Sequence, residues 1–255
     1  MIFLHNLIAT PYIPVSSVNK LLIAGNAPEN ILNSLILRGI EPVRTTSLST
    51  LPRNLSYHPD MQFVNIAKGI MVCAKGVSAD IVKYLNNLGF EIIFGYSFGG
   101  EKYPFDIAYN CAVVGKVAFL NLKYTDAKVI EMLKKFDITP VHIPQGYAKC
   151  SIAIVNQEAI ITADTKIYEN AVQNGIDALI IPPQKNIVLE GYDYGFIGGS
   201  SGLISETEMA FTGDFNTLDS ADLIRKFLDK KGVVPVSLGN CRIADIGSLI
   251  PLTSV

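Results

Sequence analysis

Short apolar segments recur along this chain, and they alternate with segments of helical periodicity. The first segments of five successive pairs are 20–25, 69–76, 116–122, 158–164 and 208–214. The second segments of these pairs are 40–45, 90–95, 138–144, 178–182 and 233–239. Apolar runs of this length between turn residues predict strands, and the amphipathic stretches between them predict helices. The pattern therefore predicts a strand–helix–strand unit that is repeated five times, with units starting near residues 20, 69, 116, 158 and 208.

Capping residues support the predicted helices. Ser78 precedes apolar residues at helical spacing between Ile81 and Leu88, and a serine before such a run is a typical helix N-cap. Thr125 is expected to cap the helix of the third unit in the same way. Glycines follow four of the helices, at Gly39, Gly89, Gly175 and Gly232.

An extra extended run distinguishes these units from those of a doubly wound sheet. Such runs precede the second to fifth units at 61–67, 107–114, 150–155 and 202–205, each joined to the next strand by a short turn. The glycine-rich G-x-G-x-x-G turn of dinucleotide-binding sheets is absent. We therefore predict one α/β domain over residues 1–255, a propeller of five strand–strand–helix–strand units with pseudo-fivefold symmetry.

The extra strand of the first unit has two possible sources. It can come from the N-terminal segment 2–9 or from the C-terminal segment 247–254. In the second case the ring closes on itself, and the joint leaves no sheet edge exposed.

Composition excludes several classes of protein. The 255 residues are 49% hydrophobic and 17% charged with a net charge of −2, and no basic block offers a nucleic-acid footprint. No apolar run is long enough to span a bilayer, and the N-terminus lacks the basic region of a signal peptide. The four cysteines are Cys73, Cys111, Cys150 and Cys241. They show no CxxC spacing, which predicts free thiols in a cytoplasmic protein without a metal or cofactor.

Five such units resemble the α/β propeller of the pentein superfamily. That superfamily includes arginine and agmatine deiminases, dimethylarginine dimethylaminohydrolase and a non-catalytic ribosome anti-association factor. The segment PDMQFV (59–64) is similar to a PDxxFV segment of the dimethylaminohydrolases that helps to hold the substrate guanidinium. The segment YAKCS (147–151) is similar to the HLKS-type segment that carries the catalytic histidine. The resemblance implies guanidine chemistry at a central pore.

The chain departs from the family pattern at the residues that carry this chemistry. Tyr147 stands where the resemblance places the histidine, and Asn65 and Ile66 replace acidic residues. The closing segment 246–252 holds no cysteine, and Cys241 lies upstream of the family position. The resemblance therefore implies the fold more strongly than the activity.

Guanidine chemistry needs a carboxylate that pairs with the planar cation, a nucleophilic thiolate and a histidine that moves the proton. The resemblance places the starts of the innermost strands at the pore. The candidate catalytic residues there are His58, Cys150 and Cys241, and Asp245 precedes the closing strand. The candidate substrate-binding residues are Asp60, Asp106, Tyr147, Lys149, Ser200 and Ser201.

A rotated arrangement would restore a complete catalytic set. His58-Pro59-Asp60 resembles the HxD motif of the deiminases, and Cys150 follows about two units later. An imidazolium beside Cys150 would lower its pKa below the free value of about 8.5 and make it the most reactive thiol. The competing interpretation makes His58 a strand-entry residue, Asp60 a turn cap and Cys150 a core residue. Cys73 and Cys111 are expected in the core, and Cys241 is expected to be exposed.

The loop GFIGGSSGLIS (195–205) can turn several backbone N–H groups toward one point as an anion-binding nest, although hairpin loops use the same residues. Taken together, the sequence favours a protein that binds a small guanidino- or amino-acid-like ligand in the pore, with hydrolase or amidinotransferase chemistry as an extension. The alternative is a catalytically silent scaffold that binds a macromolecule. No partner nucleic acid or membrane is expected, and the oligomeric state is left open.

Overall fold

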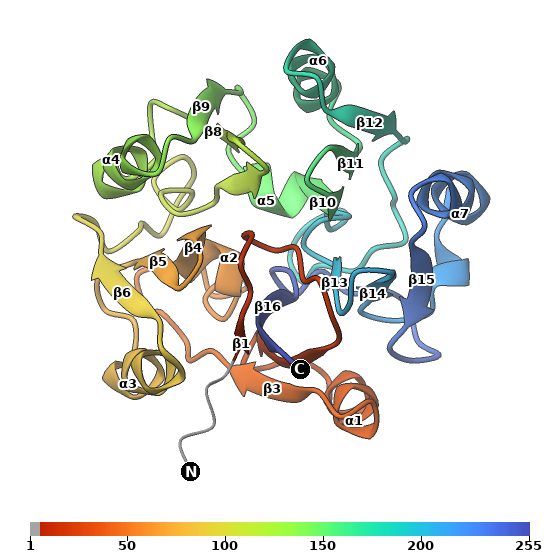
Figure 1. Ribbon diagram of the computed structural model, residues 1–255, viewed down its shortest axis with the longest axis horizontal. Coiled ribbons are helices and arrows are strands. Elements are labelled where there is room, and N and C mark those ends of the chain that lie inside the picture. The colour runs from red at the N-terminus through yellow and green to blue at the C-terminus, as the bar shows by residue number, and fades with distance from the viewer. Residues whose placement is uncertain (1–5) are drawn as a thin grey trace.

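The computed structural model describes residues 6–255, which form five small sheets around a central axis (Figure 1). The long helices lie at the periphery of the ring. The innermost strands are β16 (Ile250–Ser254), β4 (Phe63–Ala67), β7 (Ala112–Val114), β10 (Ile152–Asn156) and β13 (Ser201–Leu203). The middle strands are β2 (Val18–Ile23), β5 (Ile70–Cys73), β8 (Val117–Leu120), β11 (Ala159–Thr162) and β14 (Glu208–Phe211).

Each middle strand leads through a helix to an outer strand. The helices are α1 (Glu29–Leu37), α3 (Ala79–Leu88), α4 (Ala127–Lys135), α6 (Thr165–Gln173) and α7 (Ala221–Lys230). The outer strands are β3 (Glu41–Arg44), β6 (Glu91–Phe94), β9 (Thr139–His142), β12 (Asp177–Ile180) and β15 (Val234–Ser237). A 3-10 turn, η1 (Phe215–Thr217), precedes α7. No helix in residues 6–255 is both long enough and apolar enough to cross a bilayer.

The pairing is the same in every unit. The innermost strand is antiparallel to the middle strand, as in Ile152 opposite Thr162, and the middle strand is parallel to the outer strand, as in Ala159 opposite Asp177. Parallel neighbours need a crossover, and the helix supplies it. The predicted five-unit α/β propeller is therefore confirmed.

The C-terminal strand provides the innermost strand of the first unit. β16 pairs antiparallel with β2, with Ile250 opposite Leu22. A short strand, β1 (Asn6–Leu7), pairs with the other edge of β16. Residues 2–5 of the N-terminal segment lie outside the described residues. Because the two ends of the chain share one sheet, the ring is joined by strand pairing.

Amphipathic helices cover buried middle strands. The strand β11 is buried along its whole length, and α3 turns Ile81, Leu85 and Leu88 toward the core. Burying each of these side chains contributes about 1.5–3 kcal/mol. Ser78 caps α3 as predicted, by accepting from the N–H of Asp80. The predicted cap Thr125 is wrong, because the helix begins one residue later and Asp126 accepts from the N–H of Lys128.

The residues just before two of the innermost strands are helical, which corrects the predicted extended runs. One-turn helices α2 (Pro59–Gln62) and α5 (Ala148–Ser151) precede β4 and β10. Proline favours the first turn of a helix, because its fixed φ fits and its missing N–H has no partner there. Before β7, residues 107–109 form turns and residues 110–111 are irregular. Asp60, Lys149 and Cys150 therefore project from helical turns at the axis.

Candidate active site at the ring axis

Equivalent residues of the five units meet at the axis, each two positions before its innermost strand. They are Met61, Asn110, Cys150, Gly199 and Ser248. The Asn110 side chain joins three units, because Nδ2 lies 3.1 Å from Cys150 Sγ and 3.2 Å from Met61 Sδ. Its Oδ1 accepts from the backbone N–H of Lys149 at 2.7 Å. The repeat therefore converges on a small set of polar side chains.

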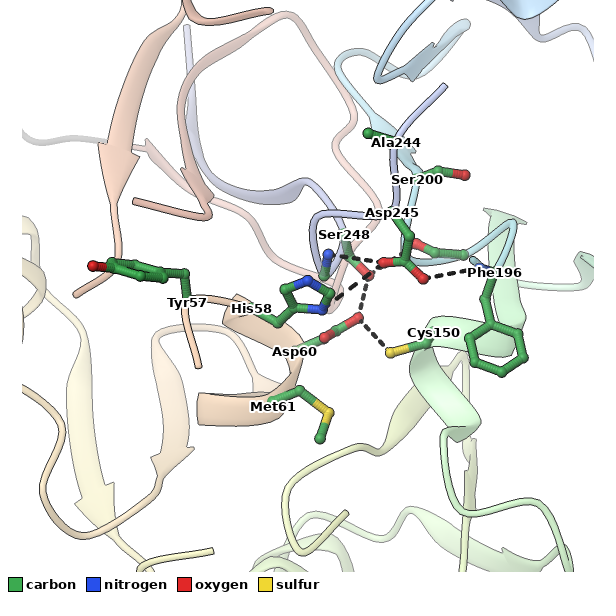
Figure 2. A network of polar contacts seen from close by, with 12 residues as sticks. Tyr57, His58, Asp60, Met61, Cys150, Phe196, Ser200, Ala244, Asp245 and Ser248 are labelled. Carbon is green, nitrogen blue, oxygen red and sulfur yellow. Dashed lines mark hydrogen bonds and ion pairs between the residues drawn. The ribbon is translucent and has the colours of Figure 1, made fainter. Parts of the chain in front are cut away.

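Asp60 is the centre of this set (Figure 2). Its Oδ2 accepts from Cys150 Sγ at 3.2 Å and from Ser248 Oγ at 2.6 Å. Ser248 Oγ in turn accepts from Lys149 Nζ at 2.9 Å. These four residues are all at most 4% exposed. A buried chain from lysine to serine to carboxylate to thiol thus links α2, α5 and the segment before β16.

Asp245 lies beside this chain and faces His58. Its carboxylate accepts from the N–H groups of Phe196 at 2.8 Å and Gly247 at 3.1 Å. His58 Nδ1 is 3.9 Å from Asp245 Oδ1. Neither His58 Nδ1 nor Asp60 Oδ1 has a hydrogen-bond partner within residues 6–255, although both atoms are buried. Buried polar atoms are normally paired, so these two atoms are exceptions within the cluster.

Burial dominates the ionisation of this cluster. It lowers the pKa of His58 to about 4, although Asp60 opposes the shift, and it raises the pKa of Asp245 to about 6. It also raises the pKa of Asp60, against the charges of His58 and Lys149, and lowers that of Lys149. At neutral pH His58 is therefore a neutral imidazole, and its contact with Asp245 is not an ion pair.

Burial raises the pKa of the Cys150 thiol well above its ordinary value, and Asp60 and Asp245 add to this shift. The expectation that an imidazolium activates Cys150 is therefore wrong, because His58 is neutral and the carboxylates of Asp60 and Asp245 raise the pKa of the thiol. Cys150 is a thiol whose proton is directed at Asp60.

A cavity of about 210 Å³ opens above this cluster. His58, Cys150 and Asp245 form its polar part, and Asp193 lies among its lining residues. The other lining residues are Leu55, Tyr147, Leu189, Tyr192, Tyr194 and Phe196. A concave, mostly apolar site with a few convergent polar groups is typical of small-molecule binding.

The structure brings together most of the residues that the sequence selected. His58, Asp60, Lys149 and Cys150 form the buried cluster, and Tyr147 lines the cavity. Asp106 stands behind Tyr147 and accepts from its hydroxyl at 2.7 Å, and burial raises the pKa of Asp106. Lys149 Nζ is held by Ser248 and the carbonyl of Gly198, 5.4 Å from the ring centroid of Tyr12, and it does not line the cavity.

Ser200, Ser201 and Cys241 are not brought to the cavity. The hydroxyls of both serines donate to the carbonyl of Ile197, at 3.0 and 2.7 Å. Cys241 is exposed, and its sulfur accepts from Asn30 Nδ2 at 3.3 Å. Cys73 and Cys111 are buried, as expected, and burial raises the pKa of each thiol to about 12.

The glycine-rich loop that suggested an anion nest packs against a carboxylate. A Cβ on Gly199 would lie 2.1 Å from Asp245 Oδ1, so glycine allows the buried carboxylate to approach this backbone. The N–H of Gly199 donates to the carbonyl of Cys150, and its carbonyl accepts from Ser248 N–H. In this arrangement the loop serves to place Asp245 and the segment before β16.

Sequence reasoning missed Asn110 and Ser248, although a signal for both was present. Aligning the units on their innermost strands places these two residues at the same position as Cys150. Ser248 has φ of 76°, a left-handed conformation that is uncommon for a residue other than glycine. The preceding Gly247 also has φ of 76°, and a Cβ there would lie 2.3 Å from His58 Cβ.

We expect His58 and Asp245 to have opposite effects on the pH dependence of stability. The folded pKa of Asp245, about 6, exceeds its unfolded value of about 3.9. The contribution of Asp245 to the free energy of unfolding is therefore present below pH 4 and is lost as the pH rises through 6. The folded pKa of His58, about 4, is below its unfolded value of about 6.5. The contribution of His58 to the free energy of unfolding is therefore present above pH 6.5 and is lost as the pH falls toward 4. Each contribution is about 3 kcal/mol.

Denaturant unfolding between pH 4 and pH 7 separates the two groups. Relative to the wild type, Asp245→Asn should become more stable with rising pH, because the opposing carboxylate is gone. His58→Gln should become less stable with rising pH. Parallel curves for the wild type and both variants would show that neither group titrates with these shifts.

Comparison with known proteins gives a family and a fold. Residues 22–250 match the model of a family described as a family of unknown function, DUF6873. No curated protein matches the sequence significantly.

Solved structures show the same fold at low sequence identity. An inosamine-phosphate amidinotransferase from Streptomyces griseus has a TM-score of 0.60 and 8% identity, over 98% of each chain. SxtG, an amidinotransferase of saxitoxin biosynthesis from Microseira wollei, has a TM-score of 0.53 and 12% identity, over 93% of this chain and 96% of that one. The dimethylarginine dimethylaminohydrolase of Pseudomonas aeruginosa, complexed with citrulline, has a TM-score of 0.51 and 8% identity, over 87% and 92%. The pentein fold expected from the sequence is confirmed.

Proposed function

Since this chain belongs to the family of unknown function DUF6873 and has the pentein fold, we propose that it binds a small guanidinium or amidinium compound at the ring axis and modifies it through Cys150. The family description names no activity, and the structural relatives differ from this chain at about nine positions in ten. The proposal therefore depends on the residues of the site.

The convergence of His58, Cys150 and Asp245 in the lining of one cavity, with Asp60 hydrogen-bonded to Cys150 behind that lining, is the observation that carries the proposal. The Asp245 carboxylate in the lining, the buried Asp60 carboxylate behind it and a neutral histidine give this end of the cavity negative charge, which suits a planar cation. A thiol in the same cavity supplies a nucleophile. The alternative of a silent scaffold is not favoured, since the relatives named above are enzymes of amidine transfer and guanidine hydrolysis.

In the proposed reaction the Cys150 thiol proton passes to Asp60 Oδ2, which already accepts from it. The sulfur forms a bond to the central carbon of the guanidinium, and the C=N electron pair moves to nitrogen. The amine that leaves takes the proton from Asp60, and an amidino group is left on the sulfur. Water or a second amine then attacks that carbon while neutral His58 takes its proton. The C–S bond breaks, and the sulfur leaves and receives that proton, which restores the Cys150 thiol and neutral His58.

The raised pKa of Cys150 is compatible with this role. Desolvation and the charges of Asp60 and Asp245 keep the thiol protonated when the cavity holds no cation. A guanidinium in the cavity would offset those negative charges and would favour the thiolate. The nucleophile would therefore form when a cationic substrate is present.

Competition between two electrophiles tests this proposal. Iodoacetamide is neutral and 2-chloroacetamidine is a cation, although both alkylate thiols. We expect iodoacetamide to label the exposed Cys241 first and chloroacetamidine to label Cys150 first, as measured by peptide mass spectrometry at pH 7.5. Guanidine should protect Cys150 from chloroacetamidine and should leave the labelling of Cys241 unchanged.

Asp245→Asn is the matched variant, because it keeps the size of the side chain and removes its charge. We expect it to slow labelling of Cys150 by chloroacetamidine at least about tenfold, a difference equivalent to 1.4 kcal/mol. If chloroacetamidine also prefers Cys241 in the wild type, the cavity does not select amidinium cations and the proposed function is wrong.

A further inference from the structure

The cavity above Cys150 has an aromatic wall. The Tyr147 and Phe196 rings lie 6.0 Å apart at 34°, and the Phe196 and Tyr194 rings lie 6.4 Å apart at 75°. Tyr103 continues the series outward, 5.8 Å from Tyr147. Leu55 and Leu189 also line the cavity. Such surfaces bind flat apolar groups and stack with them.

The same cavity offers no cation to a carboxylate. Among residues 6–255, its lining includes neither lysine nor arginine. Lys149 directs its ammonium to Ser248 and the carbonyl of Gly198. Burial keeps His58 neutral near pH 7, with a pKa of about 4. A substrate carboxylate would instead meet the like charges of Asp245 and Asp193.

A separate hollow of about 520 Å³ adjoins the cavity and shares His58, Leu189 and Asp245 with it. Arg53 lines this hollow, but it is exposed to solvent, and Glu190 lies in the same lining. An α-amino acid group would have to pass the His58–Asp245 pair to reach Arg53. The arrangement gives little preference for such a group.

The size of the cavity suits a ring with an amidine head. An apolar cavity of about 150 Å³ accommodates benzene. The cavity here is about 210 Å³, which leaves room for the three further heavy atoms of an amidinium. The head group would face Asp245 and Cys150, and the ring would lie against Phe196 and Tyr147.

We propose that the substrate is a guanidine or amidine carrying a flat aromatic or similarly compact apolar substituent, rather than a guanidino amino acid. This inference rests on the proposed function, because it assumes that the cation binds beside Cys150. It adds the substrate class, which the fold by itself does not determine.

Isothermal titration calorimetry with matched probes tests the substituent. Phenylguanidine and benzamidine should bind at least about tenfold more tightly than methylguanidine, and benzamide, which is neutral, should bind more weakly than benzamidine. L-arginine should bind no better than methylguanidine. Phe196→Ala should weaken the binding of phenylguanidine at least about tenfold more than it weakens the binding of methylguanidine. The control is Phe98→Ala, which removes an aromatic side chain that is 53% exposed and outside the cavity. It should leave the affinities for phenylguanidine and methylguanidine unchanged.

The outcomes separate this inference from the function on which it rests. If methylguanidine and phenylguanidine bind with equal affinity and Asp245→Asn weakens both, the proposed aromatic substituent is wrong, but the proposed cation site is supported. If L-arginine binds most tightly and Arg53→Ala removes that advantage, an amino acid substrate replaces the one proposed here. If benzamide binds as tightly as benzamidine, or if no cation binds, the proposed function fails as well.

Discussion

Replacing Lys149 with methionine is expected to lower the free energy of unfolding by about 3–5 kcal/mol at pH 8. Lys149 is buried and supplies positive charge next to Asp60 and Asp245, whose pKa values it lowers. Without it, two buried carboxylates lose their compensating charge, and Ser248 loses its donor. The midpoint of thermal unfolding should fall by roughly 2–4 °C per kcal/mol for a chain of this size.

The pH dependence and a second variant identify the cause. The loss of unfolding free energy caused by Lys149→Met should be smaller at pH 5, because Asp245 becomes protonated below its pKa of about 6. Adding Asp60→Asn to Lys149→Met should recover part of the stability, since contacting groups are not additive. Lys83→Met, on the exposed face of α3, controls for the change of residue type. A Lys149→Met protein as stable as the wild type at pH 8 would mean that Lys149 carries no charge in the fold.

Replacing Cys150 with alanine is expected to reduce turnover of guanidine or amidine substrates by about 10³-fold or more, because removing a covalent nucleophile costs at least this much in comparable enzymes. The measurement is release of amine or ammonia from phenylguanidine and agmatine. The fold should survive, since the change removes one sulfur atom from contacts with Asn110 and Asp60.

Cys241→Ala is the matched control, because Cys241 is a free thiol on the surface. It should retain full turnover. Turnover that survives in Cys150→Ala and disappears in Cys241→Ala would assign the nucleophile to Cys241. Wild-type turnover in both variants would exclude both thiols as the nucleophile.

The five-unit fold was predictable because its signals are local. Each unit carries two short apolar runs around an amphipathic helix, and glycine marks two of the hairpin turns, at Lys68-Gly69 and Gly115-Lys116. The errors were local as well. Residues 61–62 and 150–151 adjoin the apolar runs of the following strands and were predicted as extended, but they belong to the helical turns 59–62 and 148–151. Patterns this short do not distinguish one helical turn from the start of a strand.

The candidate site was predictable in part. The pentein resemblance implies a site at the starts of the innermost strands, and His58, Asp60 and Cys150 lie there. Ser248 was not predictable from the resemblance, because the family pattern implies a cysteine in the closing segment. Asn110 was not predictable because an amide suggests no chemistry by itself, although it holds Cys150 in place.

The sequence by itself determined the periodic pattern, and with it the units, their order and the residue types at the axis, because these properties depend on neighbours within a few positions. Only the tertiary structure decided which of these residues meet and what charge each one carries. Asp60 and Ser248 are 188 positions apart in the chain and form a hydrogen bond of 2.6 Å. The pKa values of His58 and Cys150 are set by desolvation, and desolvation exists only when all five units surround the axis.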